Sequence, residues 1–156
     1  TRANVAYFGT FGYELDLNKL SYEEISEVKQ QIAFMKEYRE LIQFGTFYRL
    51  KSPFEGNETA WMTVSEDKKT ALVFWYRERN VVNADFTRVR LQGLDPDFIY
   101  RNEYNGTENY GDELMNLGLL TTDCTAGEPT SEDAPCTDYE SRIYVLTTVA
   151  RIPSPL

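Results

Sequence analysis

The chain has 156 residues, of which 42% are apolar and 26% are charged, so it has globular composition and the length of one domain or part of a larger protein. It contains no histidine, which excludes a Ser-His-Asp triad, a Cys-His pair and an HExxH zinc site within the chain. The net charge is −9 and the basic residues are scattered singly, so we expect no nucleic acid as a partner.

Membrane and cofactor signals are missing from the sequence as well. The longest apolar run, 71–76, is far shorter than the roughly 20 residues that a membrane-spanning helix needs, so we expect no membrane insertion. Neither a GxGxxG nor a GxxxxGK(S/T) pattern occurs, so we expect no nucleotide and no other cofactor. The N-terminus has no initiating Met and no h-region, and an apolar segment begins almost at once. We therefore expect the chain to be a fragment.

The first predicted element is a strand at Val5 to Gly9. This run combines β-branched and aromatic residues, which favour extended structure, and Gly9 and Gly12 then break it into a loop. A strand so near a chain end normally pairs with a preceding segment.

A helix is predicted from Ser21 to Phe44. Ser21 lies three positions before Glu24, which is the spacing of a capping box, and Gly45 follows as a C-cap. Apolar side chains recur at steps of three and four, with charged residues on the other face. The apolar positions are Ile25, Val28, Ile32, Met35, Tyr38 and Ile42. We expect about six turns of helix, with these positions, Tyr38 excepted, buried.

After Gly45 the pattern changes to short β-like runs separated by turn residues, so we place a domain boundary there. The candidate strands are 46–50, 59–65, 70–77, 87–91, 98–104 and 142–151. Short strands at such spacing indicate an antiparallel sandwich or barrel. One helical turn is predicted within 112–119, and the polar stretch 121–138 is predicted to be a long surface loop.

Glu14 and Asp16 are candidate functional carboxylates. They lie two residues apart after an apolar run and a glycine turn, so an extended backbone would place both on one face. A glycosidase or a metal site could use such a pair. No third ligand accompanies them, and paired carboxylates are common in loops and first helical turns. We therefore interpret the pair as structural and predict no metal site.

The aromatic cluster Phe74-Trp75-Tyr76, with Trp61 and Tyr100, allows two interpretations. Planar aromatic rings can stack on sugars. In a strand, however, alternate residues face opposite ways, so Phe74 and Tyr76 on one side and Trp75 on the other make both faces apolar. We favour this second interpretation, a central strand packed on both faces.

Cys124 and Cys136 lie in the polar loop, and two cysteines without histidine are too few for a closed structural zinc site. A disulfide or two free thiols remain. The sequons Asn57-Glu58-Thr59 and Asn105-Gly106-Thr107 both fall in predicted turns. We predict a Cys124–Cys136 disulfide, because the two cysteines are isolated in one loop and the sequons fit an oxidising compartment. The localisation, cytoplasmic or secreted, stays open.

Two long motifs carry a family resemblance: VAYFGTFGYELDL at 5–17 and YRELIQFGTFYRL at 38–50. Shorter ones follow, namely SPF at 52–54, WMTVS at 61–65, LQGLDP at 91–96, YR at 100–101, GDELM at 111–115 and YESRIYVL at 139–146. Together they resemble the C-terminal part of bacterial and fungal α-galactosidases of glycoside hydrolase family 36, over nearly the whole chain.

The resemblance implies a fold that is mainly β. Enzymes of this family have an N-terminal β-supersandwich, a catalytic (β/α)8 barrel and a C-terminal antiparallel β-domain. Residues 1–44 are then the last β/α unit of the barrel, with Val5 to Gly9 as its strand and the helix at 21–44 as its helix. Residues 45–156 are the C-terminal antiparallel β-sandwich. The missing start is explained in the same way, since earlier barrel strands would lie upstream.

The resemblance also implies hydrolysis of terminal α-galactosyl residues of oligosaccharides such as raffinose and melibiose, with retention of configuration. Two aspartates on earlier barrel strands do this in the family, in motifs that do not occur here. We therefore assign no catalytic residue, and Glu14 and Asp16 stay structural. The implied partners are the rest of the α-galactosidase chain, a galactoside bound by the full enzyme, and further copies in a homo-oligomer such as a tetramer.

Two alternatives remain: a non-catalytic carbohydrate-binding module and an oligomerising β-domain. Exposure of Trp61 and Trp75 separates the first from a scaffold, because binding needs solvent-facing rings. An exposed apolar patch would favour the second.

Overall fold

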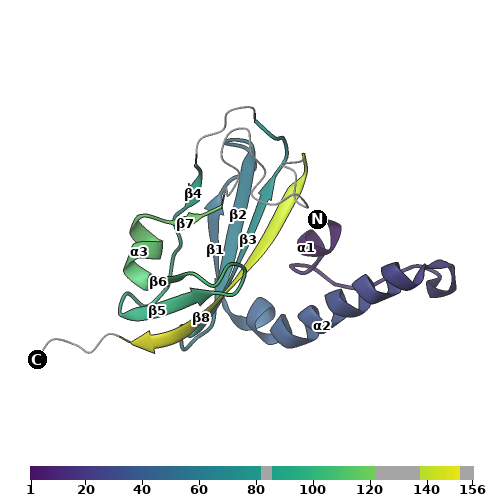
Figure 1. Ribbon diagram of the computed structural model, residues 1–156, viewed down its shortest axis with the longest axis horizontal. Coiled ribbons are helices and arrows are strands. Elements are labelled where there is room, and N and C mark those ends of the chain that lie inside the picture. The colour runs from purple at the N-terminus through teal and green to yellow at the C-terminus, as the bar shows by residue number, and fades with distance from the viewer. Residues whose placement is uncertain (82–85, 122–137, 152–156) are drawn as a thin grey trace, which may run out of the picture.

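A six-stranded antiparallel sheet forms the centre of the computed structural model, which describes residues 1–81, 86–121 and 138–151 (Figure 1). The strand order is β1-β2-β3-β8-β5-β6. In that order the strands are β1 (Thr46–Lys51), β2 (Glu58–Val64), β3 (Thr70–Arg77), β8 (Glu140–Arg151), β5 (Phe98–Asn102) and β6 (Glu108–Tyr110). The short strands β4 (Arg88–Val89) and β7 (Leu119–Leu120) form a second antiparallel sheet. The predicted class, mainly antiparallel β, is confirmed.

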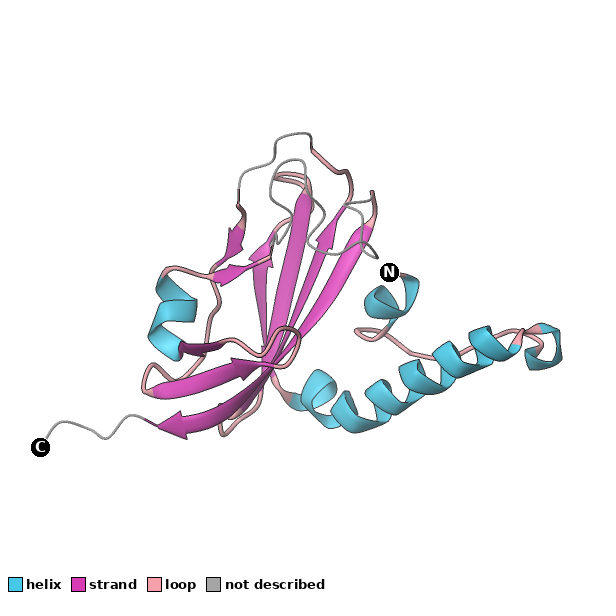
Figure 2. Cartoon of the chain, viewed as in Figure 1, coloured by secondary structure: helices cyan, strands magenta, loops and turns pink. Residues whose placement is uncertain are grey.

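Both faces of the large sheet are apolar. The small sheet and the N-terminal helices lie on opposite sides of it (Figure 2). Val73 and Trp75 of β3 belong to a cluster that includes Val89 of β4 and Leu119 of β7, so the small sheet packs on this face. Leu72 and Phe74 point the other way, into a cluster with Tyr7 and Met35. This alternation is what a central strand packed on both sides requires, and it confirms the interpretation of 74–76 as core.

The helices lie at the N-terminal side and beside β6. They are α1 (Arg2–Ala6), the 3-10 helix η1 (Leu17–Lys19), α2 (Tyr22–Phe44) and α3 (Gly111–Asn116). Ser21 caps α2 as predicted: its hydroxyl accepts from the Glu24 N–H at 3.2 Å, while its own N–H donates to the Glu24 carboxylate at 2.8 Å. The helical turn predicted within 112–119 is confirmed as α3.

Gly45 ends α2, but it does not adopt the left-handed conformation typical of a C-cap glycine. Its φ is −67°, so no left-handed conformation requires glycine there. A Cβ at this position would instead lie 2.5 Å from both the Leu41 carbonyl oxygen and the Thr63 hydroxyl. Glycine is needed because the helix end meets β2 at close range.

The strand predicted at Val5 to Gly9 is wrong, because this part of the chain forms the end of α1 and a turn. The helical conformation pairs backbone groups locally: Val5 N–H donates to the Thr1 carbonyl and Tyr7 N–H to the Ala3 carbonyl, both at 3.1 Å. A strand without a neighbour in the structure would leave these groups unpaired.

The burial predicted for the α2 stripe is also wrong at four of five positions. Only Met35 is buried, while Ile25, Val28, Ile32 and Ile42 are half-exposed. Figure 1 shows the reason: α2 leaves the sheet and its N-terminal end extends well beyond it. Residues that pack against the sheet cluster come from the second half of the helix, and they are Phe34, Tyr38, Leu41 and Ile42.

Candidate functional site

The structure separates the roles of Glu14 and Asp16. Asp16 is the N-cap of η1, and one of its carboxylate oxygens accepts from both the backbone N–H and the side-chain amide of Asn18 at 3.1 Å. Glu14 is exposed and forms no hydrogen bond or ion pair with any described residue. Within those parts of the chain, no group of three or more His, Cys, Asp or Glu could hold a metal ion. Asp16 therefore has the local capping role that the structural interpretation requires.

The aromatic side chains do not form an open platform for sugars. Trp75 is 0% and Tyr100 1% exposed, so neither ring presents a face to solvent. Trp61 is partly buried, and its ring lies 4.7 Å from that of Tyr76 and 5.7 Å from that of Phe8. Stacking on a carbohydrate needs a free ring face, which Trp75 and Tyr100 do not offer and which the neighbouring rings restrict at Trp61. The carbohydrate-binding alternative therefore loses its main candidates.

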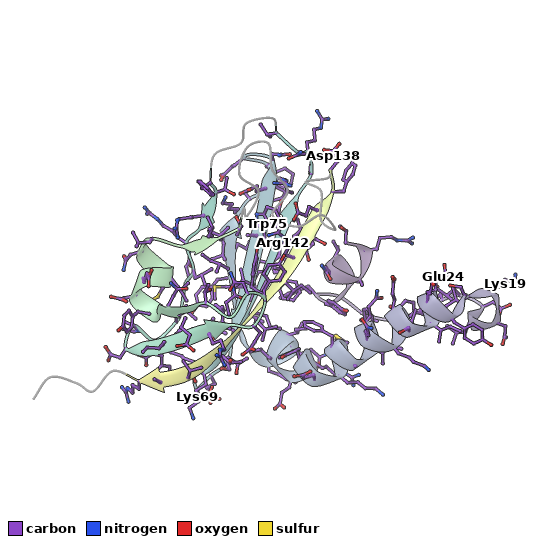
Figure 3. The ribbon with its side chains drawn as sticks, in the orientation of Figure 1. Lys19, Glu24, Lys69, Trp75, Asp138 and Arg142 are labelled. Atoms are coloured by element: carbon purple, nitrogen blue, oxygen red, sulfur yellow. The ribbon has the colours of Figure 1, made fainter. Side chains whose placement is uncertain are left out.

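A buried cluster of charges lies above Trp75, which the sequence analysis did not identify. The carboxylate of Glu140 forms ion pairs with both Arg77 and Arg142, and the three side chains are only 16%, 6% and 12% exposed. The guanidinium carbons of Arg77 and Arg142 lie 5.5 and 5.7 Å from the centre of the Trp75 ring. Trp75 and Arg142 are labelled in Figure 3. Register brings them together, since Arg77 pairs with Glu140 and Trp75 with Arg142 across β3 and β8. Sequence alone does not show that register.

Hydrogen bonds from β3 and from the start of β8 hold the N-terminal segment in place. The Tyr76 hydroxyl donates to the Asn4 carbonyl at 2.6 Å, and the Asn4 side-chain amide donates to the Ser141 hydroxyl at 2.9 Å. The Thr1 hydroxyl donates to the Tyr139 carbonyl at 2.7 Å. Burial raises the pKa of Tyr76, so its hydroxyl stays neutral and remains a donor. These contacts fix α1 to β3 and to the start of β8.

An apolar groove lies between the loop after α1 and helix α2. Its volume is about 640 Å³. Its apolar lining residues are Phe11, Leu15, Leu17, Val28, Ile32 and Met35. Lys36 and Arg39 of α2 also line it. Val28 and Ile32 of the half-exposed α2 stripe therefore face a concave surface formed with the chain's own N-terminal segment.

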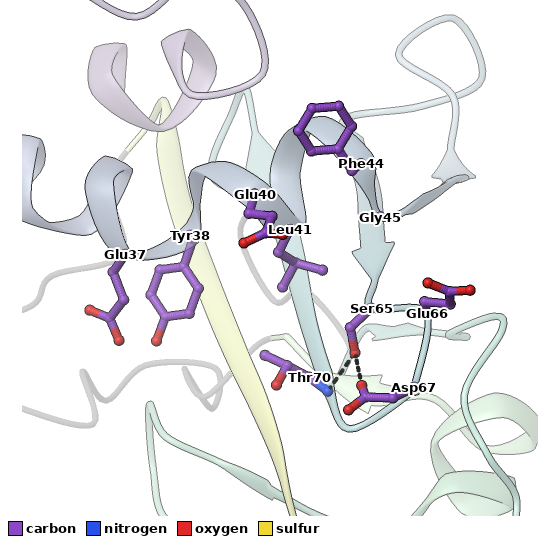
Figure 4. Close-up of a pocket in the computed structure, with 10 residues that line it drawn as sticks. All are labelled: Glu37, Tyr38, Glu40, Leu41, Phe44, Gly45, Ser65, Glu66, Asp67 and Thr70. Atoms are coloured by element: carbon purple, nitrogen blue, oxygen red, sulfur yellow. Dashed lines mark hydrogen bonds between the residues drawn. The ribbon is translucent and has the colours of Figure 1, made fainter.

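A second depression, of about 670 Å³, is lined by four carboxylates, those of Glu37 and Glu40 on α2 and of Glu66 and Asp67 in the β2–β3 turn (Figure 4). The Ser65 hydroxyl donates to Asp67 at 2.7 Å, and a backbone hydrogen bond from Lys69 lowers the pKa of the Asp67 carboxyl. These hydrogen bonds shape the turn itself.

Nearly all of the surface loop predicted at 121–138, namely residues 122–137, lies outside the described residues. Cys124 and Cys136 lie outside the described residues, so their disulfide stays a prediction. Among the described residues, none of the helices combines the length and apolar character that crossing a bilayer requires.

Comparison with known proteins gives the family context of this arrangement. Residues 58–146 match the model of the glycosyl hydrolase family 36 C-terminal domain, and residues 1–45 match the melibiase model. The chain is 53% identical to alpha-galactosidase AgaA of Geobacillus stearothermophilus over 119 residues, which is 76% of this chain and 16% of that protein. It is 44% identical to alpha-galactosidase Mel36A of Lactobacillus acidophilus, with the same coverage.

Solved structures agree with the fold. The alpha-galactosidase AgaB of Geobacillus stearothermophilus superimposes with a TM-score of 0.83 at 45% identity, over 95% of this chain and 19% of that one. The alpha-galactosidase of Lactobacillus brevis gives 0.86 at 39% identity, over 100% and 21%. The chain thus spans about a fifth or less of the length of these relatives. Since the domain model covers more than half of its residues, the chain belongs to glycosyl hydrolase family 36 and contains the C-terminal domain of that family.

Proposed function

We propose that this chain is the C-terminal scaffold of an α-galactosidase that removes terminal α-galactosyl residues from oligosaccharides such as raffinose and melibiose with retention of configuration. The match of residues 58–146 to the family's C-terminal domain is the observation that carries the proposal. The relatives named above are α-galactosidases. Structures of Geobacillus AgaA variants hold raffinose and stachyose, which supports substrates of this class.

Within this proposal, residues 1–44 contribute to the last unit of the barrel and residues 45–156 form the C-terminal β-domain. The melibiase match at 1–45 ends where α2 gives way to β1, which supports this boundary. The half-exposed stripe of α2 and its apolar groove fit a barrel helix whose inner side is covered by other barrel elements. The remainder of the enzyme is therefore the proposed partner of this surface.

The catalytic groups are proposed to lie outside this chain. Retaining hydrolysis uses two carboxyl groups about 5–5.5 Å apart on either side of the scissile bond. Glu14 is exposed on a loop, and Asp16 is occupied in capping η1. Neither side chain lines the groove beside it, and within the described part of the chain neither forms a contact with a second carboxylate.

We also propose that the full enzyme is a homo-oligomer such as a tetramer. Aromatic side chains near the edge strand β1 are open to solvent, with Phe54 95% and Phe47 46% exposed. They line a groove of about 600 Å³ together with Phe8 and Trp61. Clustered exposed aromatics are typical of surfaces that become covered on association. We expect sedimentation of the full enzyme with Phe54→Ser to show a smaller species than the unmodified full enzyme forms.

A chimera tests the scaffold proposal. In it, this chain replaces the matching C-terminal segment of Geobacillus AgaA. We expect the chimera to hydrolyse para-nitrophenyl α-galactoside, because the shared fold (TM-score 0.82) preserves the barrel contact surface. The same chimera with Phe54→Ala should stay active, whereas Trp75→Ala should destabilise the C-terminal domain and lower the yield of folded chimera. A chimera that folds, as judged by circular dichroism and gel filtration, yet shows no activity would contradict the proposal.

A further inference from the structure

The turn between β5 and β6 presents Asn105 in open space. Residues 103–108 are all exposed, and Gly106 adopts a left-handed φ of +73° with no atom within 4 Å of the place a Cβ would take. The turn is closed by two backbone hydrogen bonds, from Gly106 N–H to the Asn102 carbonyl at 2.7 Å and from Asn102 N–H to the Thr107 carbonyl at 2.8 Å. Asn105 therefore stands on a defined turn with room around it.

The side chain of Asn105 is held through its oxygen only. The oxygen Oδ1 accepts from the Thr107 N–H at 3.1 Å and from the Thr107 hydroxyl at 2.8 Å. The nitrogen Nδ2 has no hydrogen-bond partner among the described residues. The atom that would carry a modification is thus exposed, while the hydroxyl of the same sequon already contacts the amide group.

In the second sequon, at 57–59, both polar atoms of the asparagine side chain are already hydrogen-bonded. The Asn57 side chain is half-buried, and its amide forms a reciprocal pair with the backbone of Arg79. Nδ2 donates to the Arg79 carbonyl at 2.5 Å, and Oδ1 accepts from the Arg79 N–H at 2.9 Å. A sugar on Nδ2 would displace this pair, which joins the start of β2 to the segment after β3.

We propose that Asn105 is an acceptor site for N-linked glycosylation and that Asn57 is not. The reaction requires an oligosaccharyltransferase and a lipid-diphosphate-linked oligosaccharide, as in a secretory pathway. A bond forms between Nδ2 of Asn105 and the anomeric carbon of the donor sugar. The bond from that carbon to the phosphate oxygen breaks, the lipid diphosphate leaves, and a base of the transferase takes the Nδ2 proton.

The test is secretion of the whole 156-residue chain from yeast behind an added signal peptide. The folded, non-aggregated fraction is treated with an N-glycanase and its peptides are mapped by mass spectrometry. We expect one N-glycan, at Asn105. It should be absent from Asn105→Gln and from Thr107→Ala, and it should remain in Thr107→Ser, which keeps the sequon, and in Asn57→Gln.

Measuring the folded fraction matters because a chain can be glycosylated before it folds. Any chain modified at Asn57 would lack the pairing with Arg79 and should be depleted from that fraction. A folded fraction without a glycan at Asn105, or one that carries a glycan at Asn57, would overturn the proposal. The Thr107→Ala variant keeps Asn105 itself, so loss of the glycan there reports the sequon and not a folding defect.

Discussion

Replacing Trp75 by alanine is expected to lower the free energy of unfolding by about 3–5 kcal/mol, which is the usual cost of truncating a large buried aromatic side chain. The ring is 0% exposed in the middle of β3, within the larger of the two apolar clusters. The guanidinium groups of Arg77 and Arg142 lie over it and would lose their aromatic contact. Because domains of this size are stable by only about 5–15 kcal/mol, such a loss approaches global unfolding.

Urea denaturation followed by tryptophan fluorescence or circular dichroism measures this change. Phe54→Ala is the matched control, since this ring is 95% exposed and its removal should change stability by less than about 0.5 kcal/mol. Equal effects of the two substitutions would show that Trp75 does not lie in the core. They would also restore the alternative in which this ring stacks on sugars at the surface.

Glu140→Ala is expected to cost about 3–5 kcal/mol, because removing one partner of a buried ion pair leaves charge without compensation. Glu140 contacts both Arg77 and Arg142, and all three side chains are at least four-fifths buried. Without the carboxylate, Arg77 keeps a buried positive charge above the Trp75 ring. The effect should persist at high salt, since buried charges are poorly screened.

The pair of Arg101 and Glu108 provides the control. Its two side chains are about half exposed, and the shortest distance between their charged atoms is 3.5 Å. Glu108→Ala should therefore change the free energy of unfolding by no more than about 1 kcal/mol, and salt should reduce that further. Similar losses for Glu108→Ala and Glu140→Ala would mean that Glu140 and its two arginine partners are not buried.

Local sequence signals were sufficient for much of the fold. The capping box at Ser21 and Glu24 located the start of α2, and alternation within 70–77 predicted a central strand with two apolar faces. Both signals report on contacts within a few residues or on simple periodicity. Short elements without such a signal were missed, among them α1, β6 and β7.

The errors have a common physical origin, which is that tertiary surroundings decide what a local pattern becomes. Val5 to Gly9 has strand-like composition, yet it pairs with none of the described strands and closes its backbone hydrogen bonds as a helical turn. The stripe on α2 is a sound helical pattern, but the sheet reaches only part of it. The Arg77–Glu140–Arg142 cluster depends on the register of β3 with β8, which no local pattern encodes.

The central claim, that this chain is scaffold and contributes no catalytic carboxylate, is tested most directly by assaying the purified 156-residue chain against para-nitrophenyl α-galactoside. Glu14→Gln and Asp16→Asn are assayed beside it, because these are the two carboxylates whose spacing resembles a catalytic pair. The account predicts no nitrophenol release above background from any of the three proteins. Turnover by the unmodified chain that disappears in either variant would contradict it.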